Sequence, residues 1–191
     1  MATAPISEFL QYVRWMDARA VEFVVGVRSP QLTEVMNSVT GLGSVTAGLV
    51  FVGLFYLAGW REEFLVTIVS LSVLGVVVGA LMSLVQRPFP PQPICMTGDD
   101  AAVTSSFPSG HAAAVTVYAT VARSSERLPF AVVSVLAAAI AFSRVYLGTH
   151  YLSDTVFGIG IGIAAALFAE WAVGRTDVDA LLARVPFEVD L

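Results

Sequence analysis

Five polar residues with the chemistry of a phosphate site stand at the ends of long apolar segments. They are Arg87, His111, Arg144, His150 and Asp154, and they include both histidines of the protein. Arginine stays charged and presents a rigid fork of donors that matches phosphate oxygens. We therefore expect Arg87 and Arg144 to bind a phosphoryl group.

Phosphoryl transfer needs a nucleophile and a general acid, and the two histidines suit these two roles. His150 and Asp154 are four residues apart, a spacing that places both on one face of a helix. A carboxylate there can accept the Nδ1–H of the histidine and leave Nε2 free to attack. His111 then remains as the general acid for the leaving group.

A helix start completes the expected anion site. Pro108, Ser109 and Gly110 precede an apolar segment, and backbone N–H groups at a helix N-terminus bind anions. Ser109 and Gly110 are therefore expected to contact the phosphate. The sequence shows no cluster with metal-ligand spacing, so we expect neither a metal nor a cofactor.

The elements that carry these residues are apolar helices. The chain is 57% hydrophobic and 13% charged, and a soluble domain would be nearer one quarter charged. A bilayer core requires about 20 apolar residues in helix. The fold class expected is all-α: an integral membrane bundle of five or six transmembrane helices. Four segments are clear: 41–59, 64–85, 129–147 and 151–173. A fifth, 109–124, is shorter, but the spans on either side of it require a crossing between them.

Residues 10–27 leave two alternatives open. The segment is apolar but contains Arg14, Asp17, Arg19 and Glu22, which are costly at the bilayer centre. An interfacial helix anchored by aromatic residues is the preferred interpretation, and a sixth span with paired charges is the alternative. Elsewhere, two glycine pairs have a spacing typical of helix packing: Gly75 with Gly79, and Gly158 with Gly162.

The arginines also predict an orientation. If the spans alternate, Arg61, Arg123, Arg127, Arg175 and Arg184 share one side, which the positive-inside rule assigns to the cytoplasm. The five polar residues then face the extracytoplasmic side. A net charge of −5 argues against a nucleic-acid partner.

The motifs resemble those of the type 2 phosphatidic acid phosphatase superfamily, which also includes soluble vanadium haloperoxidases. The second family motif stands complete as Pro108-Ser109-Gly110-His111, and the third as Ser143-Arg144, His150 and Asp154. The first motif is partial, because Arg87-Pro88 is present but Ala80 occupies the position of its lysine. The chain has no lysine at all; Gln86, Ser83 and Arg28 are the nearest alternative donors.

The resemblance implies a metal-independent lipid phosphatase that works through a phosphohistidine on His150. Its substrate would be a phosphatidic acid-like lipid or a polyprenyl diphosphate, and its partner the bilayer. Two alternatives stay open: a lipid phosphotransferase, and a catalytically silent phosphate-binding protein that lost the motif lysine. Residues 1–28 form the expected N-terminal helix, 29–173 the membrane phosphatase domain and 174–191 a cytoplasmic tail; the sequence leaves the oligomeric state open.

Overall fold

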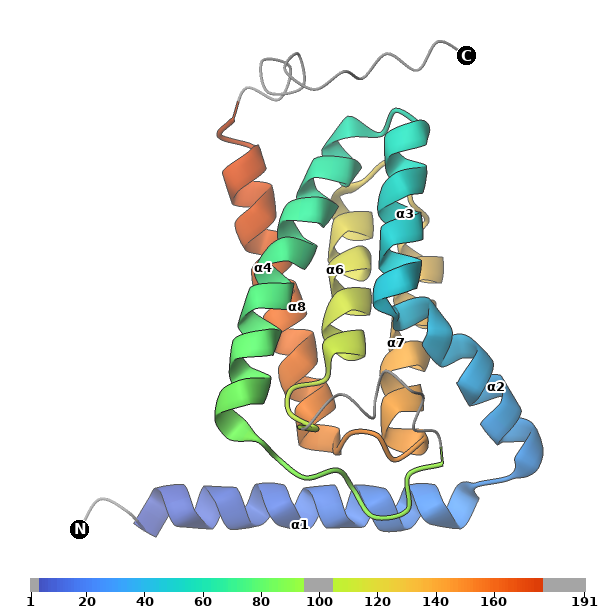
Figure 1. Cartoon of the computed structure of the whole chain (residues 1–191), viewed down its shortest axis with the longest axis vertical. Coiled ribbons are helices and arrows are strands. Elements are labelled where there is room, and N and C mark those ends of the chain that lie inside the picture. Colours follow the sequence, from blue (N-terminus) through green and yellow to red (C-terminus); the bar gives the residue numbers. More distant parts are fainter. Residues whose placement is uncertain (1–3, 95–104, 177–191) are drawn as a thin grey trace.

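The part of the chain that the structure, a computed structural model, describes is helical. It comprises residues 4–94 and 105–176, so most of the expected C-terminal tail lies outside it. Five helices lie side by side as a bundle, which confirms the expected all-α class (Figure 1). They are α3 (Val45–Leu57), α4 (Arg61–Val85), α6 (Gly110–Ser124), α7 (Phe130–Tyr146) and α8 (Leu152–Val173).

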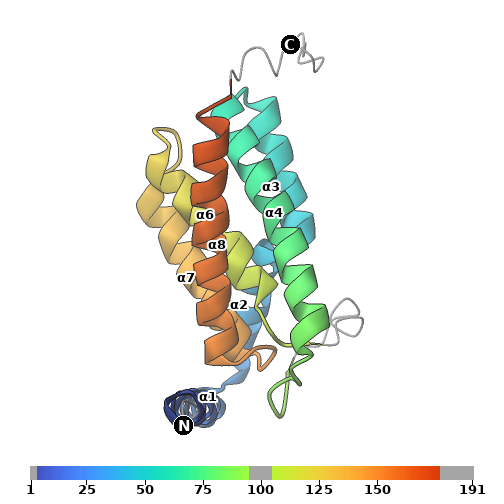
Figure 2. The same cartoon turned by 90° about the vertical axis from the view of Figure 1, so that its left-hand side faces the viewer.

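Helix α6 is the central helix of the bundle. It packs against α4, α7 and α8, and Ala112, Ala113 and Val117 are fully buried (Figure 2). Its 15 residues extend only about 22 Å, less than the thickness of a bilayer core. Because other helices surround α6, its small residues serve close packing, which explains why its sequence is less hydrophobic than that of α4 or α8.

The two glycine pairs have different environments. A Cβ atom added to Gly158 or Gly162 would collide with a backbone carbonyl of α6, so this pair allows α8 and α6 to approach closely, as predicted. Gly75 and Gly79 lie on the exposed face of α4 with nothing within 4 Å of an added Cβ. The packing prediction for Gly75 and Gly79 is wrong, since spacing alone cannot show which side of a helix faces its neighbours.

Two described helices, α4 and α8, are each long and apolar enough to cross a membrane. A third crossing is possible if α2 and η1 are combined with α3, from which they are bent by 54°. Helix α2 (Pro30–Thr40) precedes the segment expected to span from residue 41, and η1 (Gly41–Gly43) forms the first three residues of that segment. Helix α2 was not predicted, although Ser29 caps it and Pro30 stands in its first turn, a common start signal.

Helix α1 (Ala4–Val27) lies across one end of the bundle (Figures 1 and 2). Tyr12 and Trp15 stack on each other and remain more than half exposed. Val24, in contrast, is buried in a small core with Val145, Tyr146 and Leu147. The crosswise position favours the interfacial interpretation of this segment over a sixth span, because a span would run alongside the other helices.

Candidate active site

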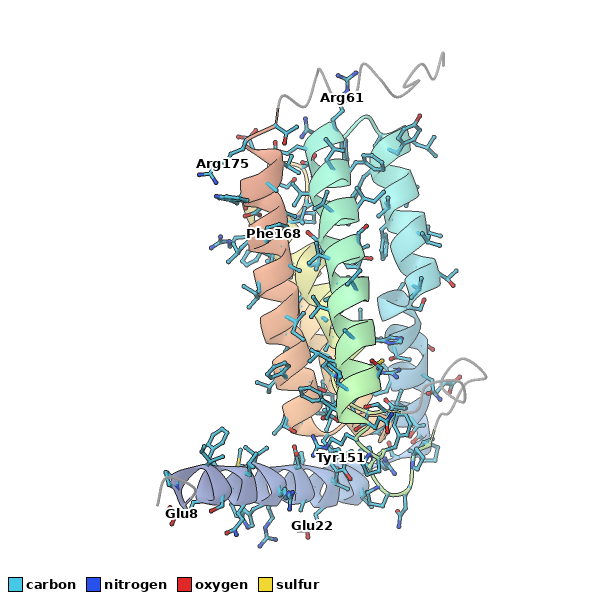
Figure 3. The ribbon with its side chains drawn as sticks, turned by 60° about the vertical axis from the view of Figure 1, so that its left-hand side comes forward. Glu8, Glu22, Arg61, Tyr151, Phe168 and Arg175 are labelled. Atoms are coloured by element: carbon cyan, nitrogen blue, oxygen red, sulfur yellow. The ribbon has the colours of Figure 1, made fainter. Side chains whose placement is uncertain are left out.

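The loops that carry the three motifs meet at the end of the bundle where α1 lies. Arg87 follows α4, Ser109 caps α6, and His150 lies between α7 and α8. Figure 3 shows Tyr151, the neighbour of His150, above α1, whereas Arg61 and Arg175 stand at the opposite end. Arg61 and Arg175, two of the arginines assigned to one side from the sequence, are thus remote from the motifs.

Arg87 is held in a network of acceptors. Its Nη1 donates to the Asp154 carboxylate at 2.5 Å and to the Ser153 hydroxyl at 2.8 Å. Its Nη2 donates to the Asp17 carboxylate at 2.6 Å, and its guanidinium stacks 4.0 Å from the centre of the Tyr151 ring. This network joins the first motif to the third and to α1.

The charge of Arg87 is secure. Burial lowers the pKa of its guanidinium, but the hydrogen bond to Asp17 and the attraction of Asp154 outweigh burial and raise the pKa above its ordinary value. Arg87 therefore stays protonated throughout the pH range in which proteins work.

The second and third motifs are also hydrogen-bonded to each other. The Ser109 N–H donates to the backbone carbonyl of Asp154 at 3.1 Å, and the Ser109 hydroxyl caps α6 by accepting from Ala112 N. Gly110 and His111 are the first residues of α6, where backbone N–H groups have no acceptor within the helix. The expected anion site at this helix start is therefore adjacent to the turn that carries His150.

His150 is 5% exposed, and its Nδ1 lies 2.5 Å from the carbonyl oxygen of Ser106. The sequence predicted Asp154 as the Nδ1 partner, and that detail is wrong. Helix α8 begins only at Leu152, so His150 precedes the helix and does not share its face with Asp154. Asp154 instead accepts from Tyr151 N at 2.9 Å and from Arg87.

The proton of His150 is still expected on Nδ1, although the partner of Nδ1 is the Ser106 carbonyl and not Asp154. A carbonyl oxygen can only accept, so Nδ1 of His150 must carry the proton. In the neutral imidazole the lone pair then lies on Nε2, as a nucleophile requires.

His111 and Arg144 both contact the segment formed by α2, which was not predicted, and η1. Arg144 is 4% exposed and donates from Nη1 to the hydroxyl of Thr40 at 3.0 Å. A Cβ atom added to Gly43 would lie 3.1 Å from Cδ2 of His111, so η1 contacts this histidine closely. Residues of α2 and η1 thus contact the predicted general acid, His111, and the second arginine, Arg144.

Two of the donors considered as replacements for the motif lysine are engaged elsewhere. Arg28 donates to the carbonyl of Tyr146 at 3.1 and 3.0 Å and to that of Gln92 at 3.0 Å. The Ser83 hydroxyl donates to the carbonyl of Ala80, the residue in the lysine position. Within the described ranges, the Arg28 side chain thus links the backbone at Tyr146 to the backbone at Gln92.

The sequence missed three residues of the network: Asp17, Ser106 and Ser153. Asp17 is 1% exposed, although it belongs to a helix whose charged residues are otherwise at the surface. The one available signal in the sequence was the energetic cost of Asp17, because a carboxylate in an apolar helix requires a partner.

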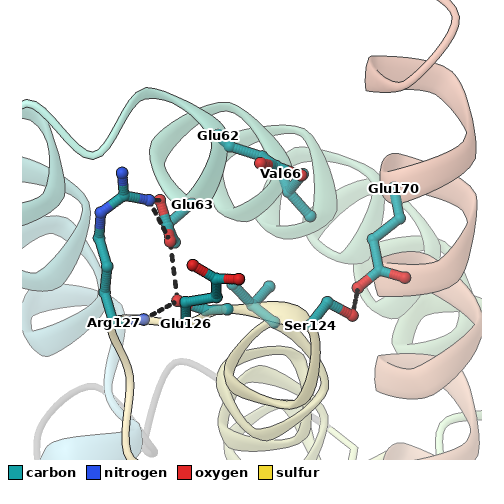
Figure 4. A pocket seen from close by; sticks show the side chains of 9 residues that line it. Glu62, Glu63, Val66, Ser124, Glu126, Arg127 and Glu170 are labelled. Atoms are coloured by element: carbon teal, nitrogen blue, oxygen red, sulfur yellow. Dashed lines mark hydrogen bonds and ion pairs between the residues drawn. The ribbon is translucent and has the colours of Figure 1, made fainter.

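A pocket of about 350 Å³ lies at the other end of the bundle, near the start of α4 (Figure 4). It is lined by carboxylates, among them Glu62, Glu126 and Glu170, with Glu63 bound to Arg127. Such a lining repels a phosphate, so this pocket is not part of the candidate site. Within residues 4–94 and 105–176, no group of three His, Cys, Asp or Glu residues could hold a metal ion.

The chain is similar in sequence to known proteins. The chain is 33% identical over 114 residues to decaprenylphosphoryl-5-phosphoribose phosphatase of Mycobacterium tuberculosis, a match that covers 60% of this chain and 63% of that relative. It is 27% identical over 169 residues to phosphatidylglycerophosphatase B of Bacillus subtilis, covering 79% of this chain and 80% of that one.

Two solved structures have the same fold. A transmembrane phosphatidylglycerolphosphate phosphatase of the PAP2 type from Bacillus subtilis superposes with a TM-score of 0.75 at 22% identity, covering 92% of this chain and 98% of that one. Aquifex aeolicus LpxE gives a TM-score of 0.69 at 24% identity, covering 80% and 93%. The profile of the PAP2 superfamily matches residues 63–176, which include Arg87 and the second and third motifs. This membrane protein therefore belongs to the PAP2 superfamily.

Proposed function

We propose that this protein is a metal-independent lipid phosphatase that hydrolyses a phosphate monoester or diphosphate of a membrane lipid. One observation carries the proposal: hydrogen bonds tie all three motifs together. Arg87 binds Asp154, Ser109 N–H binds the Asp154 carbonyl, and the N–H of His150 binds the Arg144 carbonyl. The names of the relatives, which describe phosphatases of lipid phosphates, support the same class of reaction.

In the proposed reaction, Nε2 of His150 attacks phosphorus and displaces the lipid oxygen. His111 gives that oxygen a proton as the phosphorus–oxygen bond breaks. Water then attacks the phosphohistidine, His111 takes the proton of the water, and inorganic phosphate leaves. Arg87, Arg144, the Ser109 hydroxyl hydrogen and the backbone N–H of Gly110 stabilise the charge on the phosphoryl oxygens.

The role proposed for Asp154 differs from the one expected from the sequence. Its carboxylate holds Arg87 and the N–H of Tyr151, so it fixes the arginine and the turn after His150. Asp154 thus contributes through these neighbours, and the Ser106 carbonyl orients the nucleophile.

The experiment is phosphate release from a panel of lipid phosphates by purified protein in detergent with EDTA. Release by the wild type but not by His150→Ala is expected, together with a phosphohistidine detected by mass spectrometry at alkaline pH. Thermal unfolding of both proteins checks folding. An added alcohol acceptor tests the phosphotransferase alternative, because transfer would place the phosphoryl group on that alcohol. Absence of release from every lipid would refute a phosphatase and favour the silent binder.

We further propose that the chain crosses the membrane several times and that its site faces the extracytoplasmic side. The support is the separation of Tyr151 from Arg61 and Arg175 along the bundle (Figure 3). The single cysteine, Cys95, lies outside the described residues but belongs by sequence to the connection between α4 and α6. Labelling of Cys95 in intact cells by a membrane-impermeant maleimide is expected, and labelling only after lysis would reverse the orientation.

A further inference from the structure

The N-terminal helix contributes a buried carboxylate to the candidate site. Asp17 of α1 accepts three hydrogen bonds: from Arg87 Nη2 at 2.6 Å, from Ser153 N at 2.9 Å and from Ser153 Oγ at 2.7 Å. Its side chain is 2% exposed, whereas Arg19 and Glu22 on the same helix are 63% and 65% exposed. A carboxylate with three close donors is a strong and directional attachment.

The same segment also holds the other side of the turn that carries His150. Arg28, directly after α1, donates from two nitrogens to the Tyr146 carbonyl. Val24 is buried against Tyr146 and Leu147. Contacts from the N-terminal segment therefore reach Tyr146 before His150 and Ser153 after it.

The contacts of Arg87 leave it able to bind a ligand. Both Nη1 hydrogens are directed to Ser153 and Asp154, and one Nη2 hydrogen to Asp17. Within the part of the chain that the structure describes, the second Nη2 hydrogen and Nε–H remain for phosphate oxygens. Asp17 and Asp154 thus fix the plane of the guanidinium from two sides while Tyr151 covers one face.

We infer that Asp17 is a positioning residue for phosphoryl transfer: through Arg87 and Ser153 it aligns the arginine and the start of α8 with His150. This inference rests on the proposed function. It assigns a role to α1, which lies outside the segment that matches the superfamily. Helix α1 lies across the bundle end with exposed apolar side chains, as an interfacial helix would (Figure 1).

The test is Asp17→Asn beside Glu22→Gln, a matched change of an exposed acid on the same helix. Asp17→Asn is expected to lower kcat/KM by about tenfold to a hundredfold, since a small misplacement of a binding group costs that much. Glu22→Gln is expected to match the wild type. In an Arg87→Ala background, Asp17→Asn should have a smaller effect on kcat/KM, because the route through Arg87 has been removed and only the one through Ser153 remains.

A second readout separates failure of this inference from failure of the proposed function. Binding of orthovanadate, which resembles a phosphoryl group in transfer, is measured by titration calorimetry and needs no turnover. Weaker binding to Asp17→Asn than to Glu22→Gln supports the positioning role even if no lipid is hydrolysed. Equal kcat/KM and equal orthovanadate affinity in the two variants would overturn it, as would an undiminished effect of Asp17→Asn in the Arg87→Ala background.

Discussion

Gly158 offers a sharp test of how the site is assembled, because α8 there touches the residue that caps α6. A Cβ atom at Gly158 would lie 2.5 Å from the Ser109 carbonyl oxygen and 3.3 Å from its carbonyl carbon. An ordinary contact begins near 3.4 Å, so Gly158→Ala requires the two helices to separate locally by about 0.9 Å. The contact atoms belong to the backbone, which cannot rotate away as a flexible side chain does. Either the backbone at Ser109 or helix α8 must therefore move.

This shift has two costs that can be estimated. Overpacking of this kind destabilises by about 1–3 kcal/mol, and the better helix propensity of alanine returns about 1 kcal/mol. The expected net loss in free energy of unfolding is up to about 2 kcal/mol. The same shift strains the bond from Ser109 N–H to the Asp154 carbonyl, and a misplacement near 1 Å costs up to about a hundredfold in rate.

The matched control is Gly160→Ala, on the same helix, where an added Cβ meets nothing within 4 Å. It should gain up to about 1 kcal/mol in stability and keep its rate. Thermal unfolding in detergent and phosphate release measure the two quantities for each variant. Gly158→Ala and Gly160→Ala behaving alike in both assays would refute the view that contact between α6 and α8 aligns the second and third motifs.

Two further variants test the lost lysine and the far end of the bundle. Ala80→Lys should raise kcat/KM for lipid phosphate by about tenfold or more, since an added cation stabilises developing charge, while the uncharged Ala80→Met should not; no gain would show that the site works without that cation. Arg127→Met removes the two hydrogen bonds that Arg127 donates to the buried Glu63 carboxylate, which keeps the one from the Ser125 hydroxyl. The change should lower the free energy of unfolding by about 1–3 kcal/mol at unchanged kcat/KM. Arg19→Met, which breaks an exposed ion pair, is the control. Loss of rate without loss of stability in Arg127→Met would contradict the view that this end of the bundle is separate from the site.

The sequence by itself determined the bundle helices and the motif residues of the candidate site. An apolar run long enough to span a membrane forms a helix there, because its backbone polar groups must be satisfied within the segment. The bundle helices therefore begin and end within a few residues of the predicted segments. The Ser109–His111 helix start was readable for the same local reason, since a cap and a following apolar run are adjacent in sequence.

Only the tertiary structure decided which partner each polar group has. Asp154 lies four residues from His150 but binds Arg87, because α8 begins between the two residues. Asp17 is 70 residues from Arg87 in sequence, and no local pattern encodes their ion pair. Gly158 and Gly75 belong to equally spaced pairs, yet only one faces another helix. Spacing fixes the face of a helix that a residue occupies, whereas the packing of all helices together fixes what that face meets.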